Sequence, residues 1–195
     1  MLIVLAIYYL NNGGNKMKSW IKTIFMIYRH LPRIIDSIDK VFQARALNGG
    51  VMSGSAISYN NVYNLSENLL KLTERKNALI NLKVLTDSII KGIDKKLAKI
   101  LILRYIDGFN FKMLAEHFNI SERTAYRRID EALTMASMAL EGLGYDKEKI
   151  EKEYKEEAWL FDISNESDAT DYIKIDSSYL NSIIRTYKKL SYSAN

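Results

Sequence analysis

Apolar residues recur at intervals of three and four along much of the chain, which is the spacing that lines one face of an α-helix. The first stripe of this kind runs from Trp20 to about Leu47. Its members are Ile21, Ile24, Phe25, Tyr28, Leu31, Ile35, Ile38 and Phe42. A proline inside a helix lacks the backbone N–H and clashes with the preceding turn, so Pro32 predicts a kink or a fresh helix start. Asn48 to Asn60 has no apolar period and is rich in Gly, Ser and Asn, which predicts a mobile connection.

A second amphipathic helix follows, with an apolar seam close to a heptad repeat and interrupted by Lys76. The seam consists of Val62, Leu65, Leu69, Leu72, Leu79, Leu82, Leu85 and Ile89. Two interpretations fit it: an antiparallel hairpin with the first helix, which forms an intramolecular core, or a homodimer through this leucine-rich helix.

Helix signals continue after Gly92. Asp94 is suited to accept the free N–H groups of a helix from about Lys95 to Ile106, which should end at Asp107-Gly108. Further on, Lys147 to Trp159 alternates Lys and Glu, as a solvated helix does. The tail beyond it, residues 160–195, has Tyr and Ile but few other signals, so it is either a docking segment or poorly ordered. With nine Gly, one Pro and no clear strand pattern, the expected fold is all-α.

Residues 111 to 133 have the pattern of a helix-turn-helix. Asn110 can cap the first helix, in which Leu114 and Phe118 lie one turn apart facing the core and the small Ala115 allows close helix contact. Asn119 stands where the chain must turn sharply with a positive φ, a conformation that Asn tolerates better than most residues.

The second helix of this pair predicts a DNA-reading surface. Ser121 can cap it, and Glu122 in its first turn suits the helix dipole. Its buried stripe is predicted to be Ala125, Ile129, Ala132 and Leu133. Its opposite side presents Arg123, Thr124, Tyr126, Arg127 and Arg128. An apolar back with an Arg-rich front suits the major groove of double-stranded DNA, although the same pattern is compatible with a plain trihelical core and a solvated face.

These residues resemble the C-terminal promoter-reading domain of bacterial sigma factors. The resemblance is carried by Arg104-Tyr105-Ile106-Asp107-Gly108, Leu114-Ala115, Ile120-Ser121-Glu122-Arg123-Thr124, Arg128 and Ala132-Leu133. The preceding hairpin, the Ser/Gly connection and Leu140-Glu141-Gly142-Leu143-Gly144 look more like phage and prophage regulators of the RinA and ArpU kind, which use the same domain to control late genes. The resemblance covers residues 95–144 well and residues 20–94 only in architecture.

The resemblance implies sequence-specific DNA binding and transcriptional regulation. It assigns base reading to Arg123, Tyr126 and Arg127, and phosphate contacts to Ser121, Thr124 and Arg128. Asn119 stands in place of the usual Gly and Ala125 in place of a bulkier Val, and no segment resembles the sigma-factor region that melts the promoter. An accessory regulator is therefore preferred over an intact alternative sigma factor. A third hypothesis is an interaction module that binds RNA polymerase or a sigma factor through the hairpin and tail.

Charge and chemistry refine this prediction. Residues 16–46 hold seven basic and two acidic residues, an excess that equals the whole net charge of +5, which suits either phosphate attraction or a solvated helix face. Cys is absent, so no disulfide or thiolate metal site is expected. The Gly-rich run 49–54 lacks the lysine of a phosphate-binding loop, and His30 and His117 lie far apart. We predict no enzyme activity, catalytic residue, cofactor or metal.

The apolar opening Leu2 to Leu10 is shorter than the roughly 20 residues that span a membrane, and no basic residues precede it as in a signal peptide. Asn11 to Met17 looks like a translated ribosome-binding site, which favours a translation start at Met17. We therefore expect a cytoplasmic protein without a membrane partner. The predicted organisation is a leader (1–16), a helical hairpin (17–93), the helix-turn-helix domain (94–145) and a charged helix with a tail (146–195).

Overall fold

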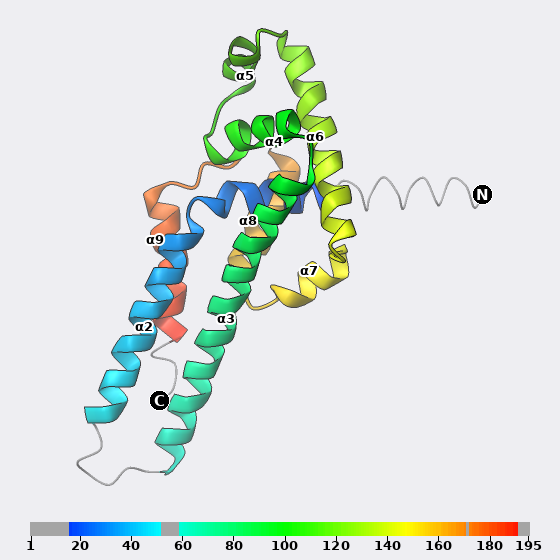
Figure 1. The fold of residues 1–195 in the computed structure, drawn as a ribbon. Helices are drawn as coiled ribbons and strands as arrows, with labels where there is room; N and C mark the ends of the chain where they lie inside the picture. Colours follow the sequence, from blue (N-terminus) through cyan, green and yellow to red (C-terminus); the bar gives the residue numbers. More distant parts are fainter. Residues whose placement is uncertain (1–15, 52–58, 171, 191–195) are drawn as a thin grey trace. The chain divides into compact units, whose positions relative to one another are not determined.

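The computed structural model describes residues 16–51, 59–170 and 172–190, and within them it contains helices and no β-strand (Figure 1). The all-α prediction is confirmed. An unlabelled helix covers residues 16–28. The elements that follow are α2 (Leu31–Val51), α3 (Tyr59–Gly92), α4 (Lys95–Leu101), the π-helix η2 (Ile102–Ile106), α5 (Phe111–Phe118), α6 (Glu122–Gly142), α7 (Lys147–Glu153), α8 (Ala158–Ala169) and α9 (Ser177–Leu190).

The chain divides into two compact units. The first contains the residues up to Arg29 together with Leu82–Lys174, and the second contains His30–Asn81 and the residues from Ile175 onward. The predicted leader lies outside the described residues except for Lys16, so the proposed start at Met17 stays a prediction. The four-part organisation predicted from the sequence likewise stays a prediction.

Pro32 marks a fresh helix start, as predicted. The helix over residues 16–28 ends in a turn at Arg29 and His30, and α2 begins at Leu31. The Ile34 N–H donates to the carbonyl oxygen of His30 at 3.1 Å, which closes the first helical turn. Proline is tolerated in that first turn, because the N–H it lacks would have had no intrahelical partner there.

The predicted connection is too long at both ends. α2 continues to Val51 and α3 begins at Tyr59, so only residues 52–58 of the predicted segment 48–60 lie outside the described helices. A glycine in a helix interior costs about 1 kcal/mol relative to alanine, and an established helix can extend through a pair of them.

The second unit is built from α2, the first part of α3, and α9. α9 packs against α2, and its buried residues include Leu180, Ile183 and Tyr187. The Lys76 ammonium, which interrupts the leucine-rich seam, lies 2.6 Å from the Asp39 carboxylate of α2. Because α9 lies in the predicted tail, residues 160–195, and is packed against α2, the tail contains a packed amphipathic helix that was not predicted from the sequence.

The leucine-rich seam of α3 is largely internal to the chain. Leu72, Leu79 and Leu82 are each exposed by 2% or less. This burial supports the intramolecular core as the role of the seam, and a homodimer through the same face stays a prediction.

The first unit contains the helix over 16–28, the end of α3, and the elements α4 to α8. The helix over 16–28 is central to its core, since Trp20, Ile21, Ile24, Phe25 and Ile27 are all buried. Leu160 and Ile163 of α8 are also buried in this unit. Among the described residues, no helix has both the length and the apolar character needed to cross a bilayer.

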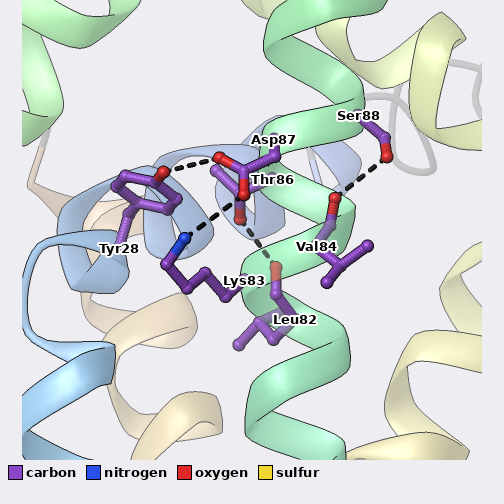
Figure 2. A network of polar contacts seen from close by, with 7 residues as sticks. All are labelled: Tyr28, Leu82, Lys83, Val84, Thr86, Asp87 and Ser88. Atoms are coloured by element: carbon purple, nitrogen blue, oxygen red, sulfur yellow. Dashed lines mark hydrogen bonds and ion pairs between the residues drawn. The ribbon is translucent and has the colours of Figure 1, made fainter.

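A polar network fastens the end of the helix over 16–28 to α3 (Figure 2). The Tyr28 hydroxyl donates to Asp87 Oδ1 at 2.5 Å, and the Lys83 ammonium donates to Asp87 Oδ2 at 3.3 Å. The hydrogen bond from Tyr28, assisted by Lys83, holds the pKa of Asp87 below its usual value. The same bond to Asp87, together with burial, raises the pKa of Tyr28.

Candidate nucleic-acid interface

The turn between α5 and α6 has the geometry that its residues predict. The Met113 N–H donates to the Asn110 side-chain oxygen at 2.8 Å, which caps α5. Asn119 adopts a left-handed conformation with φ 50° and ψ 52°. The Thr124 N–H donates to Ser121 Oγ at 3.2 Å, which caps α6. The predicted caps at Asn110 and Ser121 and the predicted turn residue Asn119 are therefore confirmed.

The back of α6 is buried against its unit. Its stripe of Ala125, Ile129, Ala132 and Leu133 is buried as predicted. On α5, Leu114 and Ala115 are buried and Phe118 is half-buried. α6 continues to Gly142, so the second helix of the pair is longer than the predicted motif (Figure 1).

The front of α6 remains open. The side chains of Arg123, Arg127 and Arg128 are exposed, and Thr124 is half-buried. Arg123 and Arg127 are four residues apart and therefore lie on one face of the helix. The exposed Ser121 hydroxyl lies 2.8 Å from that of Thr124, so the two groups at the start of α6 are held together.

Tyr126 has a partner that sequence reasoning missed. Its ring stacks on Phe111 of α5, with the ring centroids 3.5 Å apart and the planes inclined by 18°. Tyr126 nevertheless keeps 55% of its surface exposed. One face of the ring is thus occupied, and the ring is fixed beside the arginines before any ligand arrives.

The stack continues into the interior of the first unit. The guanidinium carbon of Arg104 lies 4.7 Å from the Phe111 ring centroid and 5.1 Å from that of Tyr172. Arg104 Nη1 also donates to the carbonyl oxygen of Phe109 at 2.8 Å. We call Tyr126, Phe111, Arg104 and Tyr172 the aromatic column. Arg104 is only 7% exposed, and the π-helix η2 supplies it.

Gly108 allows Tyr172 to approach the column. Its φ is +77°, and a Cβ atom at this position would lie 2.9 Å from the Tyr172 hydroxyl oxygen. Any other residue would therefore be both strained in its backbone and in collision with that ring. The Arg104 and Gly108 positions of the sigma-like motif thus act together through a residue 64 positions further along the chain.

The remaining candidate chemistry is sparse. His117 is exposed, and its ring meets those of Phe109 and Phe118 edge to face, which is a packing contact. Over the part of the chain that the structure describes, no three residues of the metal-ligating types come together in a candidate metal site.

Comparison with known protein families identifies a match. The family description of ECF sigma factors matches residues 42–141, just over half of the chain, from the later part of α2 through α6. Comparisons with curated proteins and with solved structures returned no match. The family match covers the helix-turn-helix whose caps, turn and arginine-bearing face are described above, and the chain therefore belongs to the ECF sigma factor family.

Proposed function

We propose that this protein binds double-stranded DNA sequence-specifically through α5 and α6 and regulates transcription. The observation that carries the proposal is the two-sided character of α6. Its apolar stripe is buried, while Arg123, Arg127 and Arg128 in its first two turns are exposed. A helix held in this way can enter the major groove with its N-terminal residues toward the base edges.

The candidate DNA-contacting side chains fall into two groups according to their position on α6. Arg123 and Arg127 lie on the same exposed face, and an arginine there can form paired hydrogen bonds to a guanine edge. Tyr126 contributes its free ring face and hydroxyl beside them. Ser121, Thr124 and Arg128 lie at the start and flank of the helix, where they can hold phosphates and fix its register on the duplex.

We propose further that the protein is an accessory regulator of the phage or prophage kind. Its sequence from Leu140 to Gly144 resembles regulators of the RinA and ArpU kind, and no segment resembles the promoter-melting region of sigma factors. The DNA lies in the cytoplasm of such a host, which places the protein there. RNA polymerase is the partner that such a role requires.

The family match favours one alternative, an intact alternative sigma factor. The two functions differ in what the protein does with core RNA polymerase. A sigma factor initiates transcription from a cognate promoter when added alone to core enzyme. An accessory regulator changes initiation only when a separate sigma factor is present.

DNA binding is tested with duplexes selected from a random pool by the full chain. Fluorescence anisotropy then measures affinity across a salt series, where the slope of log K against log salt is expected to be about 0.9 for each phosphate neutralised. Arg127→Ala should weaken binding to the selected site by about 5- to 150-fold, the equivalent of about 1 to 3 kcal/mol. It should change binding to an unrelated duplex much less.

Lys152→Ala is the matched control, because Lys152 is an exposed cation on α7, beyond the far end of α6. This variant removes the same charge and should bind the selected site like the parent protein. Equal affinities of the parent and Arg127→Ala for the selected site would refute the assignment of that residue. A chain that selects no duplex from the pool would refute the function.

A further inference from the structure

An acidic residue lies on the face of α6 that presents the arginines. Arg123, Arg127 and Asp130 follow one another at intervals of four and three residues, so they share one side of the helix. The Asp130 side chain is 69% exposed. An unpaired carboxylate at this position repels the phosphates of a duplex that approaches the arginines.

Asp130 is paired with a residue distant in sequence. The Lys18 ammonium, from the helix over 16–28, donates to Asp130 Oδ1 in an ion pair. The Lys18 side chain is 23% exposed, so much of its aliphatic stem is covered while its charge reaches α6. Both residues belong to the first unit.

The backbone that carries Lys18 is fixed by its neighbours. The Ser19 hydroxyl donates to the Asp168 carboxylate of α8, and Ser167 Oγ donates to the Ser19 carbonyl oxygen at 3.4 Å. Trp20 is buried and meets the Phe161 ring edge to face, with the ring centroids 5.2 Å apart. The helix that carries Lys18 is therefore packed in its unit, and this packing places Lys18 beside Asp130.

The ion pair between Lys18 and Asp130 is expected to add little to the stability of the fold. An exposed ion pair contributes about 0 to 1 kcal/mol, because solvent and salt screen it. Its larger effect is on the charge that α6 presents, since Lys18 cancels the charge of Asp130, which lies in line with Arg123 and Arg127, while the exposed Glu131 lies beside them as well.

We infer that Lys18 is a positioning residue of the DNA interface, which neutralises Asp130 on the arginine-bearing face of α6. The inference rests on the proposed function. It makes the helix over 16–28 part of the DNA-binding surface, although that helix lies outside the matched family region. It also explains how a recognition helix with an acid on its front can still face a duplex.

The experiment is a double-mutant cycle on the full chain with the duplex selected by the parent protein. The four proteins are the parent, Lys18→Met, Asp130→Asn and the double variant. Lys18→Met is expected to weaken binding about fivefold at low salt, since two charges about 4 Å apart in water interact by about 1 kcal/mol. The same change made together with Asp130→Asn should alter affinity less than twofold.

Lys18→Arg supplies the control for structure, because it keeps the cation and should bind like the parent. Circular dichroism melting of each variant confirms that the helices remain folded. A Lys18→Met effect of equal size with and without Asp130→Asn would overturn the inference, since it would mean that Lys18 touches DNA directly. No effect in either background would overturn it as well.

Arg127→Ala separates this result from the proposed function. If Arg127→Ala loses the selected site while Lys18→Met binds normally, the inference fails and the function stands. If the parent binds no duplex, both fail.

Discussion

Replacement of Arg104 by methionine tests the aromatic column directly. Methionine keeps an unbranched apolar stem of similar reach, so the change removes the guanidinium and leaves the packing of the stem largely filled. The contacts that disappear include the hydrogen bond to the Phe109 carbonyl and the cation–π contacts with the rings of Phe111, Tyr172 and, at 5.7 Å, Tyr105.

The magnitude follows from the hydrogen bond and the closer ring contacts. A hydrogen bond that involves a charged group contributes about 1.5 to 3 kcal/mol, and each cation–π contact contributes about 0.5 to 2 kcal/mol. The cost of burying the charge offsets part of this sum, because Arg104 is almost fully covered. We therefore expect Arg104→Met to lower the free energy of unfolding of the first unit by about 2 to 4 kcal/mol.

Urea unfolding followed by tryptophan fluorescence provides the assay. The two tryptophans of the chain, Trp20 and Trp159, both belong to the first unit, so the signal reports the unfolding of that unit. With an m-value of about 2 kcal/mol/M, in the middle of the usual range, the expected loss moves the midpoint by roughly 1 to 2 M.

Two further variants serve as references for the stability loss of Arg104→Met. Arg104→Lys keeps the charge but not the planar group that stacks between rings, and should fall between the parent and Arg104→Met. Arg128→Met, on the exposed side of α6, should change stability by less than about 0.5 kcal/mol. If Arg104→Met is no more destabilising than Arg128→Met, the column does not stabilise the fold.

Three other outcomes are expected. Asn119→Gly should keep the free energy of unfolding within about 1 kcal/mol of the parent. Asn119→Val should lower it by about 1 to 2 kcal/mol, because a β-branched residue resists positive φ. Chemical denaturation measures both variants, and equal free energies of unfolding would contradict this account. Leu114→Ala should cost about 2 to 5 kcal/mol in the same assay, since its side chain is fully buried between α5 and α6, and a loss below 1 kcal/mol would contradict that packing. The pKa of Asp87 is lowered in the folded state, so its stabilising contribution is present above a carboxyl pKa of about 4 and is lost as pH falls through the folded value. Asp87→Asn should therefore reduce the fall in the free energy of unfolding between pH 6 and pH 3. An unchanged fall would refute the role of the Tyr28 hydrogen bond.

The α5–α6 pair and its turn were predictable because their signals are local. Asn110 and Ser121 each cap a helix that starts at the next residue, and Asn119 is among the few residue types that accept the turn conformation. Side-chain spacing then separates the buried stripe of α6 from its arginine face without any knowledge of the neighbouring elements. The start of α2 near Pro32 was predictable for the same reason.

The partners of these residues were not predictable in the same way. Tyr172 reaches Arg104 across 68 residues, and Lys18 reaches Asp130 across 112. Neither pair can be recognised from the spacing of residues in the sequence, because each contact depends on how separate elements pack. α9 was missed although its signals are local: Asp176 Oδ1 accepts the Tyr179 N–H at 2.8 Å at its start, and Leu180, Ile183, Ile184 and Tyr187 recur at helical spacing.

These long-range contacts bear on how α6 is held. The matched family region ends at residue 141, yet Tyr172 and Lys18 lie outside it and contact Arg104 and Asp130 within it. Tyr172 supports the arginine on which Phe111 rests, and Phe111 in turn fixes the Tyr126 ring. Lys18 adjusts the charge on the same helix. The local signals therefore specify the α5–α6 pair, while segments that flank the family region contact its aromatic and charged side chains.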